Sequence, residues 1–133
     1  MSFELLSGPH KNKFIWAGRV VSLLPVLLLL FSASMKLTKA EEAMKGLEKF
    51  GYQEKVIFAL GVVEAGCTVL YLVPQTSVLG AILLTGYLGG ATATHVRVSD
   101  LFVAPIVVGV LLWLGLFLRD ERIRALVPWR SNS

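Results

Sequence analysis

A single carboxylate, Glu64, interrupts a stretch of apolar residues that is long enough to cross a lipid bilayer. It lies nine residues from both Lys55 and Val73, so roughly 13 Å of helix separates it from either end of that stretch. An anionic carboxylate at this depth is costly, so the side chain must be either protonated or paired. We expect Glu64 to point into a helix bundle and to be largely protonated at neutral pH, in which case Glu64→Gln keeps the fold. Acids in membrane segments often mark functional sites, although hydrogen-bonding between helices is an alternative role.

Two residues of a later apolar stretch are the expected neighbours of Glu64. The two stretches are joined by the short turn at residues 75–77, and matching their depth from this turn places Tyr87 opposite Glu64. Thr92 lies about five residues, or roughly 7 Å, farther along and could reach the carboxyl through a water molecule. Cys67 shares the helix face of Glu64, but a lone cysteine in an apolar segment usually packs as a small hydrophobic residue.

Three basic residues, Lys36, His95 and Arg97, lie where two apolar stretches end. Both stretches end on the same side, so we expect the three side chains to converge beneath the segment 38–51. Arg97 could hold an oxyanion with two hydrogen bonds, Lys36 would add a mobile charge, and His95 could exchange a proton near neutral pH. Such a cationic mouth would receive the anionic or polar head of a lipid- or quinone-like ligand. Anchoring to lipid headgroups, with Arg97 paired to Asp100, is the simpler alternative.

No catalytic or metal-binding motif accompanies these residues. The sequence contains no HExxH motif, no nucleotide-binding glycine pattern and one cysteine, and one of its two histidines is His10, near the N-terminus. Ligation of haem by two membrane histidines is therefore excluded, and no metal site is expected. The net charge of +4 comes from basic residues that flank apolar segments. This pattern is typical of headgroup anchors and does not indicate a nucleic-acid partner.

The composition indicates an integral membrane protein with an all-α fold. Hydrophobic residues make up 55% of the 133 residues, and no residue between Ala65 and Thr94 is charged. Because a helix needs about 20 apolar residues to cross a bilayer, the pattern predicts a four-transmembrane-helix bundle. The expected spans lie near 16–36, 54–73, 78–95 and 101–120. A secretory signal peptide that ends at Ser32-Ala33-Ser34 is the alternative interpretation of the first span.

A short amphipathic helix is expected near 39–50, between the first and second spans. Thr38 and Glu41 have the spacing of a capping box, and Gly51 is a natural C-terminal stop. Its apolar residues follow helical spacing, and its charged residues occupy the other face of the helix. This is typical of a helix that lies on the membrane surface, although a solvated connector would show the same pattern.

The third expected span is rich in small residues at helical spacing. Thr85, Gly89 and Ala93 form one row, and Gly86 and Gly90 belong to the next. Rows of this kind allow the backbones of two membrane helices to approach closely, so we expect them to pack against a neighbouring helix.

Four spans place both termini on one side of the membrane. Seven of the thirteen basic residues fall on that side and six on the other, so the positive-inside rule slightly favours cytoplasmic termini. The expected organisation is a polar N-terminal tail at 1–15, a transmembrane domain at 16–127 and a C-terminal tail at 128–133.

Several short motifs lie within the expected spans or at their ends. Ser-Ala-Ser-Met-Lys-Leu at 32–37 ends the first, Glu64 lies in the second, and Gly-Ala-Thr-Ala-Thr-His-Val-Arg at 90–97 ends the third. Arg-Asp-Glu-Arg-Ile-Arg follows the fourth at 119–124. In this order the motifs resemble the DoxX-like family of small bacterial membrane proteins over roughly residues 16–128. The resemblance implies a four-helix bundle in the bacterial inner membrane, with polar motif positions at Lys36, Glu64, His95 and Arg97.

The resemblance implies function only in outline. The family includes a subunit associated with a thiosulfate:quinone oxidoreductase, members linked to thiol-stress complexes and a eukaryotic receptor-assembly chaperone. We therefore expect a non-catalytic module that binds a lipid- or quinone-like ligand or a partner subunit, which could be a second copy of the chain. The alternative is a membrane subunit of a quinone-linked oxidoreductase in which Glu64 and His95 handle protons. The sequence requires no cofactor, and the single Cys67 argues against direct thiol exchange.

Overall fold

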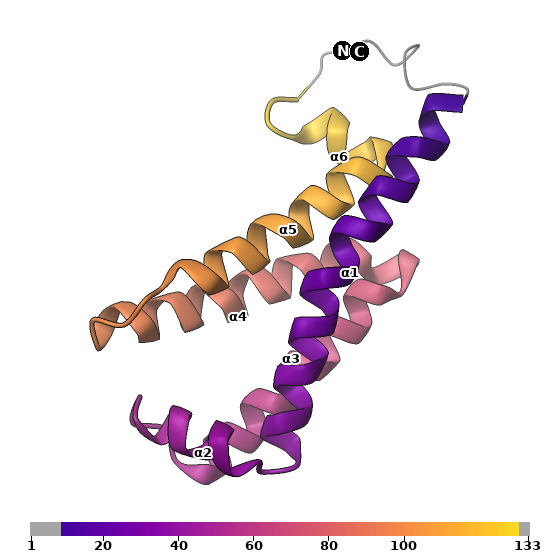
Figure 1. Ribbon diagram of the computed structural model, residues 1–133. Coiled ribbons are helices and arrows are strands. Elements are labelled where there is room, and N and C mark those ends of the chain that lie inside the picture. The colour runs from indigo at the N-terminus through magenta and orange to yellow at the C-terminus, as the bar shows by residue number, and fades with distance from the viewer. Residues whose placement is uncertain (1–8, 131–133) are drawn as a thin grey trace.

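The chain folds into helices that share a few close contacts. The computed structural model describes residues 9–130, and within them it contains no β-strand. In chain order the elements are α1 (Pro9–Leu37), α2 (Glu41–Glu48), α3 (Glu54–Leu72), the 3-10 turn η2 (Pro74–Thr76), α4 (Ser77–Arg97), α5 (Val103–Arg119) and α6 (Glu121–Leu126). The start of α1 and the whole of α6 lie at one end of the molecule and α2 at the other (Figure 1). The expected all-α class is confirmed.

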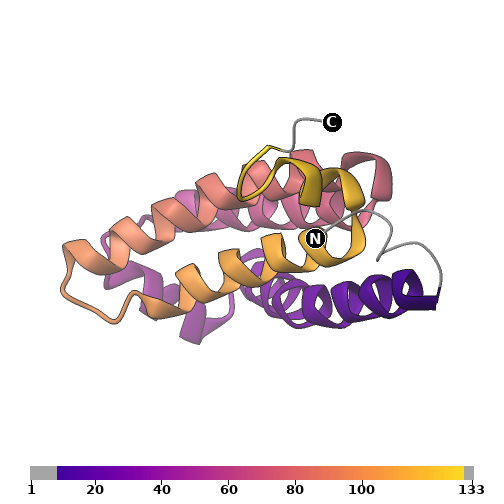
Figure 2. The same ribbon diagram turned by 90° about the horizontal axis from the view of Figure 1, so that it is seen from above.

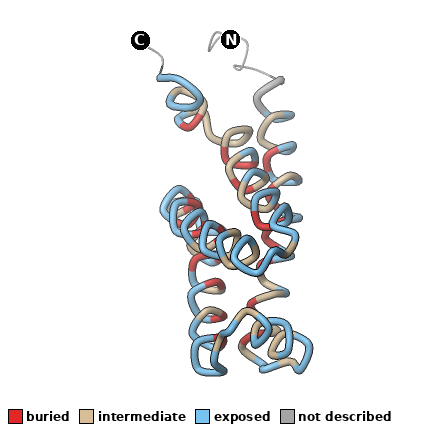
Figure 3. The backbone as a smooth tube through the Cα atoms, turned by 90° about the vertical axis from the view of Figure 1, so that its left-hand side faces the viewer, coloured by how far each residue is buried: buried red, intermediate tan, exposed pale blue. Residues whose placement is uncertain are grey.

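Three of the described helical segments are long and apolar enough to cross a membrane. They comprise residues Asn12–Leu37, Glu54–Leu72 and Pro74–Arg97. The fourth apolar helix, α5, has 17 residues and is therefore about 25 Å long, slightly less than the thickness of a hydrocarbon core. The outward side chains of these helices are apolar, such as Leu24, Leu27 and Phe31, whereas the buried positions gather where helices face one another (Figure 3). This distribution is typical of a multi-pass membrane protein, whose outer surface contacts lipid.

The first helix begins earlier than the sequence suggested. α1 starts at Pro9, so residues 9–15, which were expected in a polar tail, are helical. The remainder of that expected tail, 1–8, and residues 131–133 lie outside the described part of the chain. Proline is well tolerated in the first turn of a helix, which explains why the helix can begin at Pro9.

Glycines allow the helices to approach closely at three crossings. A Cβ added to Gly80 on α4 would lie 2.6 Å from the Cα of Tyr71 on α3. A Cβ on Gly115 of α5 would collide with Ser22 of α1, and one on Gly61 of α3 would lie 2.8 Å from the Cβ of Lys36. These contacts hold α1 against both α3 and α5, and α3 against α4.

A buried hydrogen-bond network links α1, α3 and α5. The hydroxyl of Tyr71 donates to the carbonyl of Leu112 at 2.7 Å and lies 3.0 Å from the hydroxyl of Ser22. Because the single proton of Tyr71 is used at Leu112, Ser22 donates to Tyr71. The guanidinium of Arg119 lies over the Tyr71 ring, 5.0 Å from its centre. This contact closes the core at the α6 end.

Three glycines of the small-residue rows on α4 do not pack as expected. A Cβ added to Gly86, Gly89 or Gly90 would have no neighbouring atom within 4 Å. Thr85 of the same rows does contact α5, because its hydroxyl accepts a hydrogen bond from Trp113. The glycines instead line open spaces, which are described below.

The short helix α2 forms without the predicted capping box. Its N-cap is Ala40, which has no side chain that could accept a hydrogen bond, and no side-chain cap is present. The hydroxyl of Thr38 instead donates to the carbonyl of Ser34 at 2.7 Å, so it closes α1 rather than opening α2. Gly51 adopts φ +88°, as expected for a residue that ends a helix. No residue of α2 is buried.

Asp120 separates α5 from α6. Its carboxylate accepts hydrogen bonds from the backbone N–H of Arg122 at 3.0 Å and from the Arg122 guanidinium. Partial burial by itself raises the pKa of Asp120, but these hydrogen bonds outweigh it, so the pKa lies below its ordinary value. Asp120 is therefore an ionised N-cap for α6.

Candidate functional site

A pocket of about 520 Å³ opens among α1, α3, α4 and α5 near the α2 end of the bundle. Most of its wall is apolar, with Leu28, Leu60 and Val108 among the lining side chains. Its polar lining residues come from four different segments and are Ser32, Lys36, Tyr52, Glu64, Tyr87, Thr94 and His95. A mainly apolar cavity with a few convergent polar groups is the usual form of a small-molecule site.

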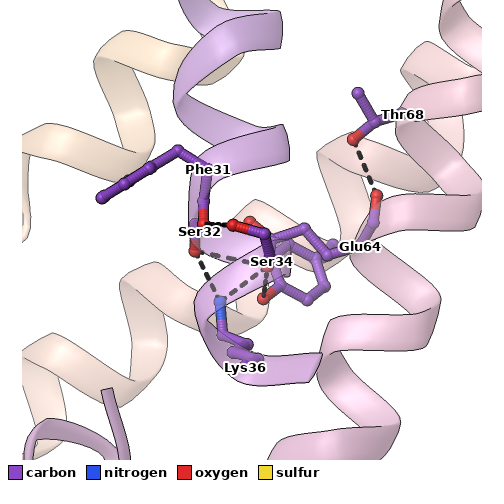
Figure 4. A network of polar contacts seen from close by, with 7 residues as sticks. Phe31, Ser32, Ser34, Lys36, Glu64 and Thr68 are labelled. Atoms are coloured by element: carbon purple, nitrogen blue, oxygen red, sulfur yellow. Dashed lines mark hydrogen bonds and ion pairs between the residues drawn. The ribbon is translucent and has the colours of Figure 1, made fainter. Parts of the chain in front are cut away.

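A buried ion pair lies at the centre of this polar group. The ammonium of Lys36 is 2.6 Å from Glu64 Oε2 and also donates to the hydroxyl of Ser32 at 2.6 Å (Figure 4). Lys36 is 8% exposed and Glu64 is 2% exposed. Ser32 lies four residues before Lys36, so both face the same side of α1, and Ser32 also donates to Glu64 Oε2 at 3.3 Å.

Glu64 is not the isolated acid for which protonation was expected, because it is paired with Lys36. Its Oε2 accepts hydrogen bonds from Lys36, Ser32 and Tyr87, the first of them from an ammonium. Of the two sequence-based options, pairing is therefore the correct one. The expected burial of Glu64 inside the bundle is confirmed.

The pairing was missed because the helix ends were assumed to lie at equal depth. The end of α1 instead packs against Gly61, two turns inside α3, where Leu37 Cδ2 would lie 3.3 Å from an added Cβ. Gly61 is almost one helical turn before Glu64, so the close approach brings Lys36 alongside the carboxylate. In the sequence, the signal for this close approach was Gly61, about one helical turn before Glu64.

Tyr87 lies opposite Glu64, as depth matching predicted. Its hydroxyl donates to Glu64 Oε2 at 3.0 Å, and its ring centre is 5.8 Å from the Lys36 ammonium. The role of Tyr87 in binding a ligand remains a prediction.

His95 also lines the pocket, on the last turn of α4. Its Nδ1 lies 2.7 Å from the carbonyl oxygen of Ala91. A carbonyl can only accept a hydrogen bond, so Nδ1 carries the proton and Nε2 is an acceptor in the neutral ring. The ring lies 4.9 Å from that of Phe50.

The structure does not bring Lys36, His95 and Arg97 together as a cationic mouth. Arg97 is exposed and does not line the pocket; it donates to the carbonyl of Phe50 at 2.7 Å. Thr92 donates to the carbonyl of Leu88 and faces a different cavity. Of the six candidate residues, Lys36, Glu64, Tyr87 and His95 therefore share this pocket, whereas Arg97 and Thr92 do not.

Residues between α2 and α3 cover one side of the pocket. Phe50 and Tyr52 are both lining residues, and the Tyr52 hydroxyl lies 2.8 Å from that of Thr94. Together with the bond from Arg97 to Phe50, this contact attaches the segment to the end of α4. Neither Tyr52 nor Ser32 was among the candidate site residues that the sequence suggested. The glycine at position 51, between Phe50 and Tyr52, was the signal in the sequence for a tight turn here.

The polar groups of the pocket retain capacity for a ligand. An ammonium has three N–H donors, and Lys36 uses two of them. Among the described residues, Glu64 Oε1 and His95 Nε2 accept no hydrogen bond. The site therefore offers one donor and two acceptors without net charge from the Lys36–Glu64 pair. No group of three metal-ligating side chains occurs among the residues that the structure describes.

Comparison with known proteins agrees with the resemblance noted in the sequence. Neither the curated proteins nor the solved structures include a match to this chain. The DoxX-like family model matches residues 20–117, a range that includes α3, α4, most of α1 and all but the end of α5, and therefore Lys36, Glu64, Tyr87 and His95. The chain belongs to the DoxX-like family.

Proposed function

We propose that this membrane protein binds a neutral amphiphile, with a carbonyl or hydroxyl head, beside the Lys36–Glu64 pair. The pair itself carries this proposal, because it is buried in a largely apolar pocket and leaves a hydrogen-bond donor and acceptors unused. A quinone or a neutral lipid has a head of this kind. An anionic head fits less well, since Glu64 compensates the charge of Lys36 and Arg97 lies outside the pocket.

In the proposed arrangement α1, α3, α4 and α5 all cross the membrane. Contacts with α1 and α4 hold α5 beside the three longer helices, and the apolar residues Leu101 and Phe102 extend its short apolar length. The start of α1 and α6 then share one side, which we assign to the cytoplasm of a bacterial inner membrane. The helix α2 would lie on the opposite surface, where its exposed charges contact water.

A second candidate function is that of a membrane subunit in a quinone-linked oxidoreductase. It is favoured by the presence of two groups that can exchange protons, Glu64 and His95, in the wall of one pocket. The chain would bind the quinone and handle protons, while a partner subunit supplied the electrons. In both functions the chain has no catalytic activity of its own.

The test is to identify what the protein retains after purification in mild detergent. Gly90 lines the pocket, and a Cβ there meets no atom within 4 Å, so Gly90→Leu should fill the pocket without disturbing the helices. Gly66 on α3 is equally open, but it lines neither this pocket nor the other cavity, which Thr92 faces. Gly66→Leu is therefore the matched control.

Native mass spectrometry of the three proteins gives the answer. We expect a retained amphiphile in the wild type and in Gly66→Leu, and its loss from Gly90→Leu. Equal occupancy in all three would exclude this pocket as the binding site. A co-purified oxidoreductase chain together with a quinone would favour the second function over the first.

A further inference from the structure

A second cavity, of about 600 Å³, lies between α4 and α5 (Figure 2 shows these helices side by side). Its wall includes Gly89, Thr92, Gly109, Trp113 and Phe117. The cavity is therefore a groove formed where small residues on both helices leave space. We refer to it as the α4–α5 groove.

The side chains that line the α4–α5 groove offer a polar head no unused hydrogen-bond donor. The indole N–H of Trp113 donates to the hydroxyl of Thr85 at 2.7 Å, and the hydroxyl of Thr92 donates to the carbonyl of Leu88 at 2.8 Å. Each of these donors is thus used within the protein, and the other lining side chains are apolar. The groove is suited to a hydrocarbon chain.

The groove and the ion-pair pocket share part of their walls. Leu88 on α4 and Pro105 on α5 line both cavities. Leu88 reaches across to α5, where its Cδ1 would lie 3.6 Å from a Cβ on Gly109. These apolar side chains lie between a pocket with unused polar groups and a groove whose hydrogen-bond donors are used within the protein.

From this shared wall we infer that the ligand is a long-tailed amphiphile whose tail leaves the ion-pair pocket past Leu88 and Pro105 and lies in the α4–α5 groove. The inference rests on the proposed function and adds the tail subsite to it. Lipid is as apolar as the groove, so the tail gains packing and a defined path rather than hydrophobic driving force. The groove would therefore select ligands by tail length and shape, and the pocket by head chemistry.

Two probes with one head and different tails test the tail subsite separately from the head site. We would use a benzoquinone with a decyl substituent and the same ring with a methyl substituent, and measure the Kd of each for the purified protein. Gly89 lines the groove but not the pocket, and a Cβ there meets no atom within 4 Å. Gly89→Leu therefore fills the groove alone, Gly90→Leu fills the pocket alone, and Gly66→Leu fills neither.

We expect Gly89→Leu to raise the Kd of the decyl probe about tenfold or more, a loss of roughly 1.4 kcal/mol, and to leave that of the methyl probe unchanged. Gly90→Leu should weaken both probes, and Gly66→Leu neither. If Gly90→Leu weakens both probes but Gly89→Leu weakens neither, the tail subsite is wrong while the proposed function stands. If neither probe binds the wild type saturably, or Gly90→Leu affects neither, the proposed function fails and the tail subsite with it.

Fluorescence of Trp113 gives a second readout that does not depend on affinity. Trp16→Phe and Trp129→Phe leave Trp113 as the only tryptophan, since the sequence contains three. A decyl probe brominated on its tail should quench Trp113 saturably, and the unbrominated probe should compete. Quenching that rises linearly without saturation, in a protein that binds the probe saturably, would place the tail elsewhere.

Discussion

The Lys36–Glu64 pair predicts a specific pattern of stability in single and double variants. The two groups are almost fully buried and 2.6 Å apart, so their attraction is about 6 kcal/mol at an effective dielectric constant of about 20. Desolvation of the two ions offsets a large part of this, so the pair as a unit contributes little to stability. Removing one partner is different, because it leaves the other charge buried without compensation.

The stability that each single variant loses is limited by the cost of neutralising the charged group that remains. In Glu64→Gln the lysine can escape its charge by releasing a proton, which for an ordinary lysine costs about 5 kcal/mol at pH 7. In Lys36→Met the carboxylate can take up a proton, which for an ordinary glutamate costs about 4 kcal/mol at pH 7. We therefore expect each single variant to lose about 3–5 kcal/mol. Lys36→Met/Glu64→Gln should recover most of that loss.

Thermal unfolding in detergent, followed by circular dichroism at pH 7.5, measures these differences. Destabilised single variants and a near-normal double variant are the expected result. A Glu64→Gln protein as stable as the wild type at pH 7.5 would refute the ion pair, because the amide can replace only a neutral carboxyl. That outcome would restore the protonated Glu64 that the sequence alone suggested.

Three further predictions concern the helix contacts away from the pocket. Gly80→Ala should lower the unfolding temperature and Gly66→Ala should not, because only at Gly80 would the new Cβ meet the backbone of α3. Tyr71→Phe removes the buried bond to the carbonyl of Leu112 and should cost about 1–3 kcal/mol in the same assay. Asp120→Asn should be less stable than the wild type at pH 7; this difference should shrink as pH falls below about 4, because a lowered pKa gives stability that is present above the unfolded pKa and lost on protonation.

The sequence predicted the helices better than their contacts. Runs without charge are required wherever a helix crosses lipid, so α3, α4 and α5 fell close to the expected ranges. Depth counted from the tight turn before α4 also placed Tyr87 beside Glu64, because a short connection leaves two antiparallel helices little freedom. The connection between α1 and α3 is longer, so the same counting failed for Lys36. Helix offset depends on side-chain packing at Gly61, which hydropathy does not report.

The unused N–H of Lys36 supports the proposed binding of a neutral head. Two of its three donors are satisfied within the protein, and a buried donor without a partner costs about 1–3 kcal/mol. A ligand carbonyl can accept this third bond without separating Lys36 from Glu64, so binding keeps the ion pair intact. An anionic head would instead compete with Glu64 for the ammonium and leave the carboxylate buried without a counter-charge. In the proposed function the Lys36–Glu64 pair would therefore favour a neutral head over an anionic one, although both kinds would be attracted to a lysine in isolation.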